Sequence, residues 1–369
     1  MIWLFFSCFL ISFVVGMLLI RKARRHARKY GSDMAQRFHA GDVPRLGGAA
    51  LLAAAMWGWA RMALAPLLGD VGNIGPMNAL TWLWLPILVP AVLGGICEDL
   101  TQRVRVRWRL ILTGMAGALA VSLLKVTVAR LDLPVIDAWM VRMPLVGMLV
   151  ALLAITGLPH AFNIIDGYNG LAGTVAMIVC AALIHVALQV GDRQLAAVLV
   201  VTVGATAGFM VWNYPRGMLF AGDGGAYFWG LVIALASIRL VQQHAQVSPW
   251  FPMLLLIYPV WETIFSIYRK VARGGSPGVA DALHFHQLIY RRIVREVFHD
   301  DDSRRMLMRN NRTSPYLWGF TCLTVAPAVL FWRNTPVLIG FCLLFVATYV
   351  VAYLMIVRFK AQRWTRLRG

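Results

Sequence analysis

The chain has 369 residues, of which 60% are hydrophobic and only 14% are charged, and its mean hydropathy is +0.69. Soluble domains carry about 25% charged residues, so this composition excludes a soluble protein and indicates one that is embedded in a membrane. The formal net charge of +19 would suit a nucleic-acid-binding protein, but the distribution of the charge along the chain gives another explanation.

Apolar runs that could cross the roughly 30 Å hydrocarbon core as helices recur along the whole chain. We expect eleven spans, near residues 2–20, 46–68, 80–97, 108–126, 144–160, 171–190, 195–212, 225–241, 250–268, 316–332 and 336–357. The predicted fold is therefore an all-α polytopic membrane protein, with one integral membrane domain over residues 1–369. The first span lacks a basic segment before it and a small-residue cleavage site, so we expect a retained helix rather than a signal peptide.

The loops between these spans form two alternating sets that differ in basic charge. The first set holds most of the 35 Lys and Arg residues and comprises 21–45, 98–109, 160–170, 213–224, 269–315 and the tail from Arg358. By the positive-inside rule this set is cytoplasmic, which places the N-terminus outside and the C-terminus inside. Anionic lipid headgroups and an anionic substrate then account for the positive charge, and no nucleic acid is expected as a partner.

The first polar motifs in chain order lie at the cytoplasmic ends of the second and third spans. The segment PRLGG at 44–48 contains Arg45 and a glycine pair that permits close helix packing or approach to a ligand. The third span ends in Glu98 and Asp99, although the helix dipole and mutual repulsion disfavour two carboxylates there. A cation would relieve both costs. Alternatively, the arginines at 103, 105, 107 and 109 neutralise the pair as a surface network.

The segment 160–171, HAFNIIDGYNGL, is a polar, glycine-containing turn between two membrane-length apolar runs. It contains Asn163, Asp166 and Asn169, with Gly167 and Gly170 between them. Carboxylate and amide oxygens are the ligands of a hard cation and they also bind sugar hydroxyls. The same residues are typical of a plain turn that joins two helices, and this segment alone does not decide between the two interpretations.

Asn213 and the segment GDGG at 222–225, which contains Asp223, follow in the next predicted cytoplasmic loop. Glycines on both sides of a carboxylate leave backbone N–H groups free to meet an anion, although a plain turn uses the same residues. Glu262 lies about seven residues before the end of its span, roughly 10 Å inside the boundary. An acid at that depth is expected in a functional or buried network, and we favour a network.

The longest cytoplasmic loop contains Asp281, His284, His286, Arg291 and Arg292. The two histidines could be zinc ligands, but no cysteine accompanies them and the acids elsewhere suit a hard cation. The five cysteines of the chain have no metal-type spacing. The acidic residues 300–302 and the basic run after them are expected to form a solvated surface.

All the acidic motifs lie on the predicted cytoplasmic side, together with the amides, the histidines and the arginine clusters. The outer loops carry Asp70, Asp132, Asp137 and Asp192, but not in such motifs. Acids suit Mg²⁺, basic residues suit phosphates and a membrane body suits a lipid. The combination indicates phosphoryl transfer between a soluble nucleotide-type donor and a lipid acceptor.

These motifs, in this order, resemble the polyprenyl-phosphate N-acetylhexosamine-1-phosphate transferase family, whose members start bacterial cell-surface polysaccharide assembly on undecaprenyl phosphate. The resemblance covers nearly the whole chain: PRLGG at 44–48, EDL at 98–100, FNIIDGYNGLAG at 162–173, N at 213, GDGG at 222–225 and SPGVADALHFHQL at 276–288. The chain departs from the family at Glu98 and Asn169, where Asp is usual, and at Gln287, where a third histidine is usual. The missing histidine favours the O-antigen and enterobacterial branch over the muramoyl-pentapeptide branch.

The resemblance implies the transfer of N-acetylhexosamine-1-phosphate from a UDP-sugar to undecaprenyl phosphate, with release of UMP. It also implies a bacterial inner-membrane protein with a cytoplasmic active site, Mg²⁺ or Mn²⁺ as cofactor, membrane lipids as partners and a homodimer as a further expectation. Asp223 is expected to bind the metal, and Glu98, Asp99 and Asp166 to be catalytic. The expected substrate-binding residues are Arg45, Asn163, Asn169, Asn213, Asp281, His284, His286 and Arg291. The alternatives are a transporter or flippase of an anionic lipid-linked sugar and a lipid phosphatase; direct attack and an aspartyl-phosphate intermediate both remain open.

Overall fold

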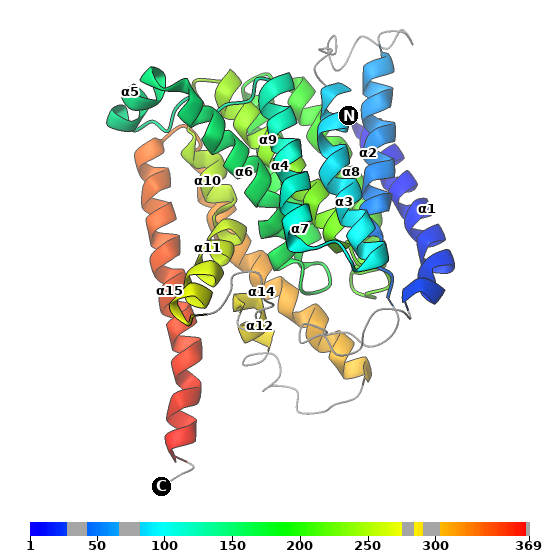
Figure 1. The fold of residues 1–369 in the computed structure, drawn as a ribbon. Coiled ribbons are helices and arrows are strands. Elements are labelled where there is room, and N and C mark those ends of the chain that lie inside the picture. The colour runs from blue at the N-terminus through cyan, green and yellow to red at the C-terminus, as the bar shows by residue number, and fades with distance from the viewer. Residues whose placement is uncertain (28–42, 66–81, 275–283, 291–302, 367–369) are drawn as a thin grey trace.

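A computed structural model describes residues 1–27, 43–65, 82–274, 284–290 and 303–366 (Figure 1). This part of the chain is helical throughout, which confirms the all-α class. Its helices are α1 (Ile2–Ala27), α2 (Gly47–Leu64), α3 (Trp84–Thr101), α4 (Val106–Leu123), α5 (Pro134–Arg142), α6 (Pro144–Ile165), α7 (Leu171–Gln189), α8 (Arg193–Asn213), α9 (Gly222–Gln243), α10 (Trp250–Leu255), α11 (Ile257–Ala272), α12 (Phe285–Ile289), α14 (Ser303–Leu330) and α15 (Thr335–Arg366).

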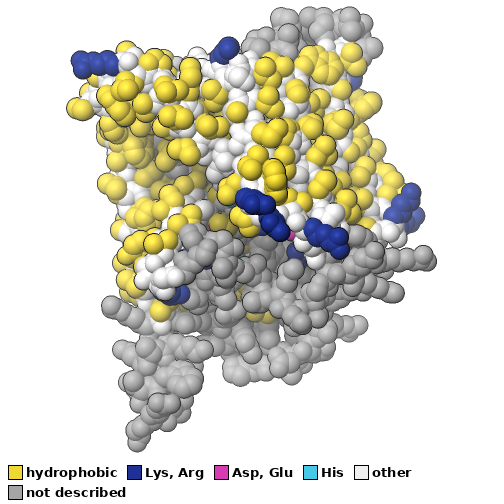
Figure 2. All heavy atoms as spheres, viewed as in Figure 1, with side chains coloured by type: hydrophobic (Ala, Val, Ile, Leu, Met, Phe, Trp, Pro, Cys, Tyr) yellow, Lys and Arg dark blue, Asp and Glu magenta, His cyan; other side chains and the backbone are white. Residues whose placement is uncertain are grey.

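Eight of the described helices are long and apolar enough to cross a membrane: α1, α3, α4, α6, α7, α8, α9 and α15. This agrees with a polytopic membrane protein. Hydrophobic side chains cover the flank of the bundle, and the Lys and Arg side chains lie toward its two ends (Figure 2). The start of α1 and the end of α15 lie at opposite ends of the bundle (Figure 1). The count of eleven spans and the orientation in the membrane stay predictions.

Three of the expected spans differ from the observed helices. The span at 46–68 is the 18-residue helix α2, which is not among the eight. The span at 250–268 is divided at Leu256 into α10 and α11. Pro259 has no N–H to donate to the carbonyl of Leu255 and its ring crowds that carbonyl, which disfavours one continuous helix there. The span at 316–332 is the second half of α14, which begins at Ser303.

The segment 131–143, between α4 and α6, contains the short helix α5. Pro134 occupies its first turn, where the missing N–H costs nothing and the fixed φ suits a helix start. Val135 is 85% exposed and Trp139 is 51% exposed. Apolar side chains in this position are suited to a membrane interface.

Helix α9 lies at the centre of the bundle. Of the residues in its apolar membrane-length stretch, 83% are buried. The helix packs against α2, α3, α6, α7 and α8. Tyr227, Phe228 and Trp229 are all buried in its second turn, because a helix that is apolar on every side is stable only when it is surrounded. The N-terminus of α9, which carries the GDGG segment, therefore lies in the middle of one end of the bundle.

The glycine pairs of three motifs meet at this end. A Cβ atom on Gly95 of α3 would lie 2.5 Å from the amide nitrogen of Gly224 and 2.7 Å from the carbonyl carbon of Asp223. Gly48 of α2 faces the backbone of Gly224 and Gly225 in the same way. Since any side chain there would push the helices apart, the glycines bring α2 and α3 against the first turn of α9. The segments around 44–48 and 98–99 are thereby placed beside Asp223.

Candidate active site

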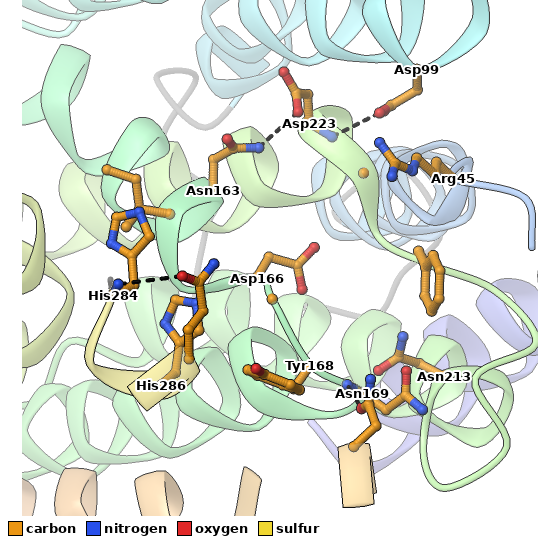
Figure 3. A pocket seen from close by; sticks show the side chains of 16 residues that line it. Arg45, Asp99, Asn163, Asp166, Tyr168, Asn169, Asn213, Asp223, His284 and His286 are labelled. Atoms are coloured by element: carbon orange, nitrogen blue, oxygen red, sulfur yellow. Dashed lines mark hydrogen bonds between the residues drawn. The ribbon is translucent and has the colours of Figure 1, made fainter. Parts of the chain in front are cut away.

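The motifs converge on one pocket of about 240 Å³ at the N-terminal end of α9 (Figure 3). Nine of the expected site residues line it: Arg45, Asp99, Asn163, Asp166, Asn169, Asn213, Asp223, His284 and His286. Glu98 is not among the lining residues. Asp281 and Arg291 lie outside the described residues. Segments up to about 240 positions apart in the sequence thus form one polar cavity at the end of an apolar bundle.

Asp223 is the most densely contacted carboxylate of the pocket. Its Oδ2 atom lies 2.5 Å from Nη1 of Arg109 and accepts a 3.3 Å hydrogen bond from the hydroxyl of Tyr227. Its Oδ1 atom accepts a 2.8 Å bond from the side-chain amide of Asn163. These neighbours hold the carboxylate at the pocket wall, between the start of α4 and the end of α6.

Asp99 is bonded to the backbone of α9. Its two carboxylate oxygens accept hydrogen bonds of 2.9 and 3.0 Å from the N–H groups of Asp223 and Gly224. The first N–H groups of a helix have no partner within the helix and favour negative charge, so Asp99 fixes the first turn of α9. Gly222, which begins this turn, has a φ of +70°, and a side chain there would collide with Asp99 and with the carbonyl of Arg45.

The expected Glu98–Asp99 pair is separated in the structure. The Oε2 atom of Glu98 accepts a 2.7 Å hydrogen bond from the N–H of Val104. Glu98 thus closes the short connection between α3 and α4, while Asp99 points into the pocket. The geometry distinguishes the two carboxylates that the sequence presented as one motif, and it gives Glu98 a contact with the loop rather than with the cavity.

Asp166 ends α6 and lines the pocket, and Figure 3 shows it between Asp223 and Tyr168. Burial, opposed by the charge of Arg45 and assisted by that of Asp223, raises the pKa of its carboxyl to about 7. Three carboxylates, those of Asp99, Asp166 and Asp223, therefore share one cavity. This crowding of like charge is the arrangement that a divalent cation relieves.

The oxygen ligands fit Mg²⁺ better than zinc. Among the described residues, no group of three or more His, Cys, Asp or Glu side chains is arranged to hold a metal ion by itself. Mg²⁺ does not need such a group, because it usually keeps several waters and takes one or two carboxylates together with substrate phosphates. Asp223 and Asp166, with the amide of Asn163 beside them, supply ligands of this kind.

The two histidines belong to the pocket wall and are connected to α11. Nδ1 of His284 lies 3.0 Å from Oε1 of Glu262, whose other oxygen accepts a 2.6 Å hydrogen bond from the hydroxyl of Tyr349. Glu262 is fully buried, which confirms the network expected for it. The rings of His284 and His286 stack with centroids 5.4 Å apart. Burial, followed by the charge of His284, lowers the pKa of His286 to about 3, so this imidazole is neutral at pH 7.

Asn213 and Asn169 have different environments although both line the pocket. The side chain of Asn213 accepts a 2.6 Å bond from the N–H of Gly170 and donates a 2.9 Å bond to the carbonyl of Leu219. Both ends of this amide join two loops, and Asn213 also lines the pocket; the substrate contact expected for it stays a prediction. Asn169 contacts α14 and is only 2% exposed.

Several polar contacts of the site were not predicted from the sequence. Arg109 was grouped with three other arginines, and only the position of α4 shows that Arg109 contacts Asp223. The run after 302 was expected to form a solvated surface, whereas Asn310 is 3% exposed and lines the pocket. Two adjacent asparagines within an otherwise basic run were the signal that could have indicated this.

Comparisons with known proteins find a similarity that is concentrated in the central part of the chain. Residues 80–241 match the model of glycosyl transferase family 4. A probable undecaprenyl-phosphate N-acetylglucosaminyl 1-phosphate transferase of Bacillus subtilis is 29% identical over 37% of this chain and 38% of its own length. A decaprenyl-phosphate N-acetylglucosaminephosphotransferase of Mycobacterium tuberculosis is 26% identical over 69% of each chain. An undecaprenyl-phosphate alpha-N-acetylglucosaminyl 1-phosphate transferase of Escherichia coli is 25% identical over 42% of this chain and 44% of its own length. The chain thus spans less than half the length of two of these three relatives.

Proposed function

We propose that this chain transfers N-acetylhexosamine-1-phosphate from a UDP-sugar to undecaprenyl phosphate. The proposal is supported by the match of residues 80–241 to the model of glycosyl transferase family 4 and by the similarity to polyprenyl-phosphate N-acetylglucosamine-1-phosphate transferases. The observation that carries the proposal is the gathering of three carboxylates, Arg45 and two histidines around one pocket at the end of a membrane bundle. Carboxylates that can share a divalent cation, next to basic groups, suit a diphosphate substrate.

The reaction forms one bond and breaks one. An oxygen of the lipid phosphate attacks the β-phosphorus of the UDP-sugar, and the bond from that phosphorus to the oxygen bridging the two phosphates breaks to release UMP. A phosphate monoester has a second pKa of about 6, so the acceptor is already largely a dianion at neutral pH and needs no strong base. The task of the pocket is to position two anionic groups and to offset their charge.

Different residues of the pocket would position the two anionic groups and offset their charge. Asp223 and Asp166 would hold Mg²⁺, which supplies charge neutralisation at the diphosphate when it is bound. Asp99 holds the first turn of α9 through two backbone N–H groups, and thereby the position of Asp223. Arg109 lies against Asp223 and offsets part of the negative charge of the carboxylates. Arg45, His284 and His286 provide donors for phosphate or sugar oxygens.

The proposed setting follows from the predicted topology. The pocket faces the cytoplasm of the bacterial inner membrane, where a sugar nucleotide is available, and UDP-N-acetylglucosamine is the proposed donor. The lipid-linked product would begin a cell-surface polysaccharide of the O-antigen type. A transporter of a lipid-linked sugar would instead place its polar site near the middle of the membrane, whereas this pocket lies where α6 ends and α9 begins.

The test is a membrane assay of UMP release with undecaprenyl phosphate, Mg²⁺ and several UDP-sugars. We expect UMP release that requires both the lipid phosphate and a UDP-N-acetylhexosamine. UDP-glucose, which lacks the N-acetyl group, serves as the control donor. UMP formation that does not require the lipid, or release of inorganic phosphate from the lipid alone, would contradict the proposal; the second result would indicate a lipid phosphatase.

A further inference from the structure

Asn311 of α14 lies outside every motif of the sequence and contacts two segments of the pocket wall. Its Nδ2 atom donates a 2.6 Å hydrogen bond to the carbonyl of Pro215, in the loop that follows α8. Its Oδ1 atom accepts a 3.0 Å bond from Nδ2 of Asn169. Pro215, Asn311 and Asn169 thus form a hydrogen-bonded chain that ends at the pocket, since Asn169 is one of its lining residues.

The direction of this chain is fixed by the carbonyl of Pro215. A backbone carbonyl can only accept a hydrogen bond, so the amide group of Asn311 must turn its nitrogen toward Pro215 and its oxygen toward Asn169. That oxygen accepts a hydrogen bond from the nitrogen of the Asn169 amide, the donor that the structure places against it. The orientation of the Asn169 side chain therefore follows from a backbone group on a different loop.

The remaining atom of this amide is Oδ1 of Asn169. It is buried and has no hydrogen-bond partner within the part of the chain that the structure describes. The backbone of Asn169 cannot easily move to give it one, because its N–H donates to Oδ1 of Asn310 at 2.8 Å and its carbonyl accepts from Ser314 at 2.6 Å. A buried acceptor without a partner at the wall of a cavity indicates a donor on the ligand.

We propose that Asn311 is a positioning residue, which orients the amide of Asn169 so that its Oδ1 accepts a hydrogen bond from an N–H or O–H group of the sugar nucleotide. The inference rests on the proposed function for the identity of the ligand. It also explains why position 169 is Asn here and not the usual Asp. An ionised Asp could not donate to Asn311, and an Asn311 that turned to donate to Asp would direct its own oxygen at the carbonyl of Pro215.

The test is a double-mutant cycle on the full chain in membranes, with KM for UDP-N-acetylglucosamine and for undecaprenyl phosphate measured by UMP release. Asn169→Ala and Asn311→Ala should each raise KM for the UDP-sugar about 10-fold, the effect of one buried hydrogen bond, and leave KM for the lipid within about two-fold. The double variant should be no worse than Asn169→Ala. Additive effects, about 100-fold in the double variant, would overturn the inference.

Asn311→Asp separates positioning from stability. It keeps the acceptor for Asn169 but sets a carboxylate against the carbonyl of Pro215, so we expect a lower Tm with KM for the UDP-sugar within about three-fold of wild type. If KM instead follows Tm across the Ala and Asp variants, Asn311 is only structural. Asn334→Asp is the matched control, because Asn334 uses its side-chain oxygen to accept from the N–H of Val337 at the start of α15, a task that Asp performs equally well.

A second measurement, of nucleotide binding, does not require the transfer reaction. The Kd of UDP-N-acetylglucosamine, from the thermal stabilisation of each purified variant, should rise about 10-fold in Asn311→Ala. If the wild type binds the nucleotide with this difference but releases no UMP, the proposed function fails and the inference stands. If the wild type releases UMP and the variants keep its KM and Kd, only the inference fails. If the wild type neither binds nor reacts, both fail.

Discussion

The two ends of the bundle carry polar clusters of similar composition that are built differently. At the end opposite the pocket, Arg130 pairs with Asp132 and donates hydrogen bonds of 2.8 and 2.7 Å to the carbonyls of Ala245 and Val247. The second oxygen of Asp132 accepts from Thr335. These contacts join the loop after α4 to the loop after α9 and to the start of α15.

The difference between the two ends lies in how the acids are neutralised. In the Arg130 cluster, Asp132 faces an arginine and a hydroxyl. Asp192 likewise accepts from the N–H of Leu195 and faces His244. In the pocket, Asp223 also faces an arginine, Arg109, but the carboxylates of Asp99, Asp166 and Asp223 all line one cavity. Within the described residues, the buried Oδ1 of Asn169 there has no hydrogen-bond partner. Polar residues at a helix end therefore indicate a site where several carboxylates gather around a cavity, and a structural connection where no cavity separates them.

The largest expected effect is in thiol labelling: each of two positions should be accessible from one side of the membrane only. After replacement of the native cysteines, single cysteines at Arg105, near the pocket, and at Val135, on α5, should react with an impermeant thiol reagent from opposite sides. The excess of Lys and Arg on the pocket side motivates this expectation. Labelling of intact cells should reach position 135 only. Labelling of both positions from one side would contradict the topology.

Removal of an acid from the pocket should lower activity, whereas removal of the acid from the Arg130 cluster should lower stability. Asp223→Asn should lower kcat about 100-fold or more, because it weakens a ligand of the metal. Its Tm should change little, because the relief of like-charge crowding opposes the loss of the ion pair with Arg109. Asp132→Asn should lower the free energy of unfolding by about 1 kcal/mol and leave kcat within two-fold. The measurements are UMP release and thermal unfolding of both variants. Near-normal kcat in Asp223→Asn would remove this residue from the metal site.

The histidines should affect donor binding more than turnover. His284→Ala and His286→Ala remove donors or acceptors from the pocket wall, so we expect KM for the UDP-sugar to rise about 10-fold with a smaller change in kcat. His185→Ala is the matched control, since His185 of α7 lies in another part of the bundle. Metal analysis of the purified protein should find negligible zinc. Stoichiometric zinc that is lost with either substitution would show that the histidines are metal ligands.

The smallest effect is expected at Asn169. Asn169→Asp keeps an oxygen toward the pocket but loses the donor to Asn311, so we expect KM for the UDP-sugar to rise about five-fold at saturating Mg²⁺. The assay varies Mg²⁺ for several UDP-N-acetylhexosamines. A change in the Mg²⁺ requirement alone would assign Asn169 to the metal rather than to the donor.

The sequence predicted much of the fold and most of the pocket lining, for identifiable reasons. Apolar runs determine where helices can cross a membrane, and the glycine pair at 47–48 indicated the close approach that α2 makes to α9. The division of the span at Leu256 was not predicted, because the hydropathy of residues 250–268 is continuous across it. Nor was α5, whose nine residues are too few for a clear helical period.

The contacts of individual side chains could not be predicted. Glu98 and Asp99 are adjacent in sequence, yet one accepts from a loop and the other from the start of α9, which depends on the rotation of α3. Arg109 and Asp223 are more than 100 residues apart. The role of Asn311 requires the carbonyl of Pro215, a backbone group that no residue type reveals. Such contacts arise from the packing of helices and not from local sequence.

The most direct test of the account is mass spectrometry of the lipid product formed in membranes from UDP-N-acetylglucosamine, undecaprenyl phosphate and Mg²⁺. The account predicts undecaprenyl-diphospho-N-acetylglucosamine in amounts equal to the UMP released, formed by the wild type and by Asp132→Asn and nearly absent with Asp223→Asn. The absence of this lipid from the wild-type reaction with every UDP-N-acetylhexosamine, or its undiminished formation by Asp223→Asn, would contradict the assignment of transfer to this pocket.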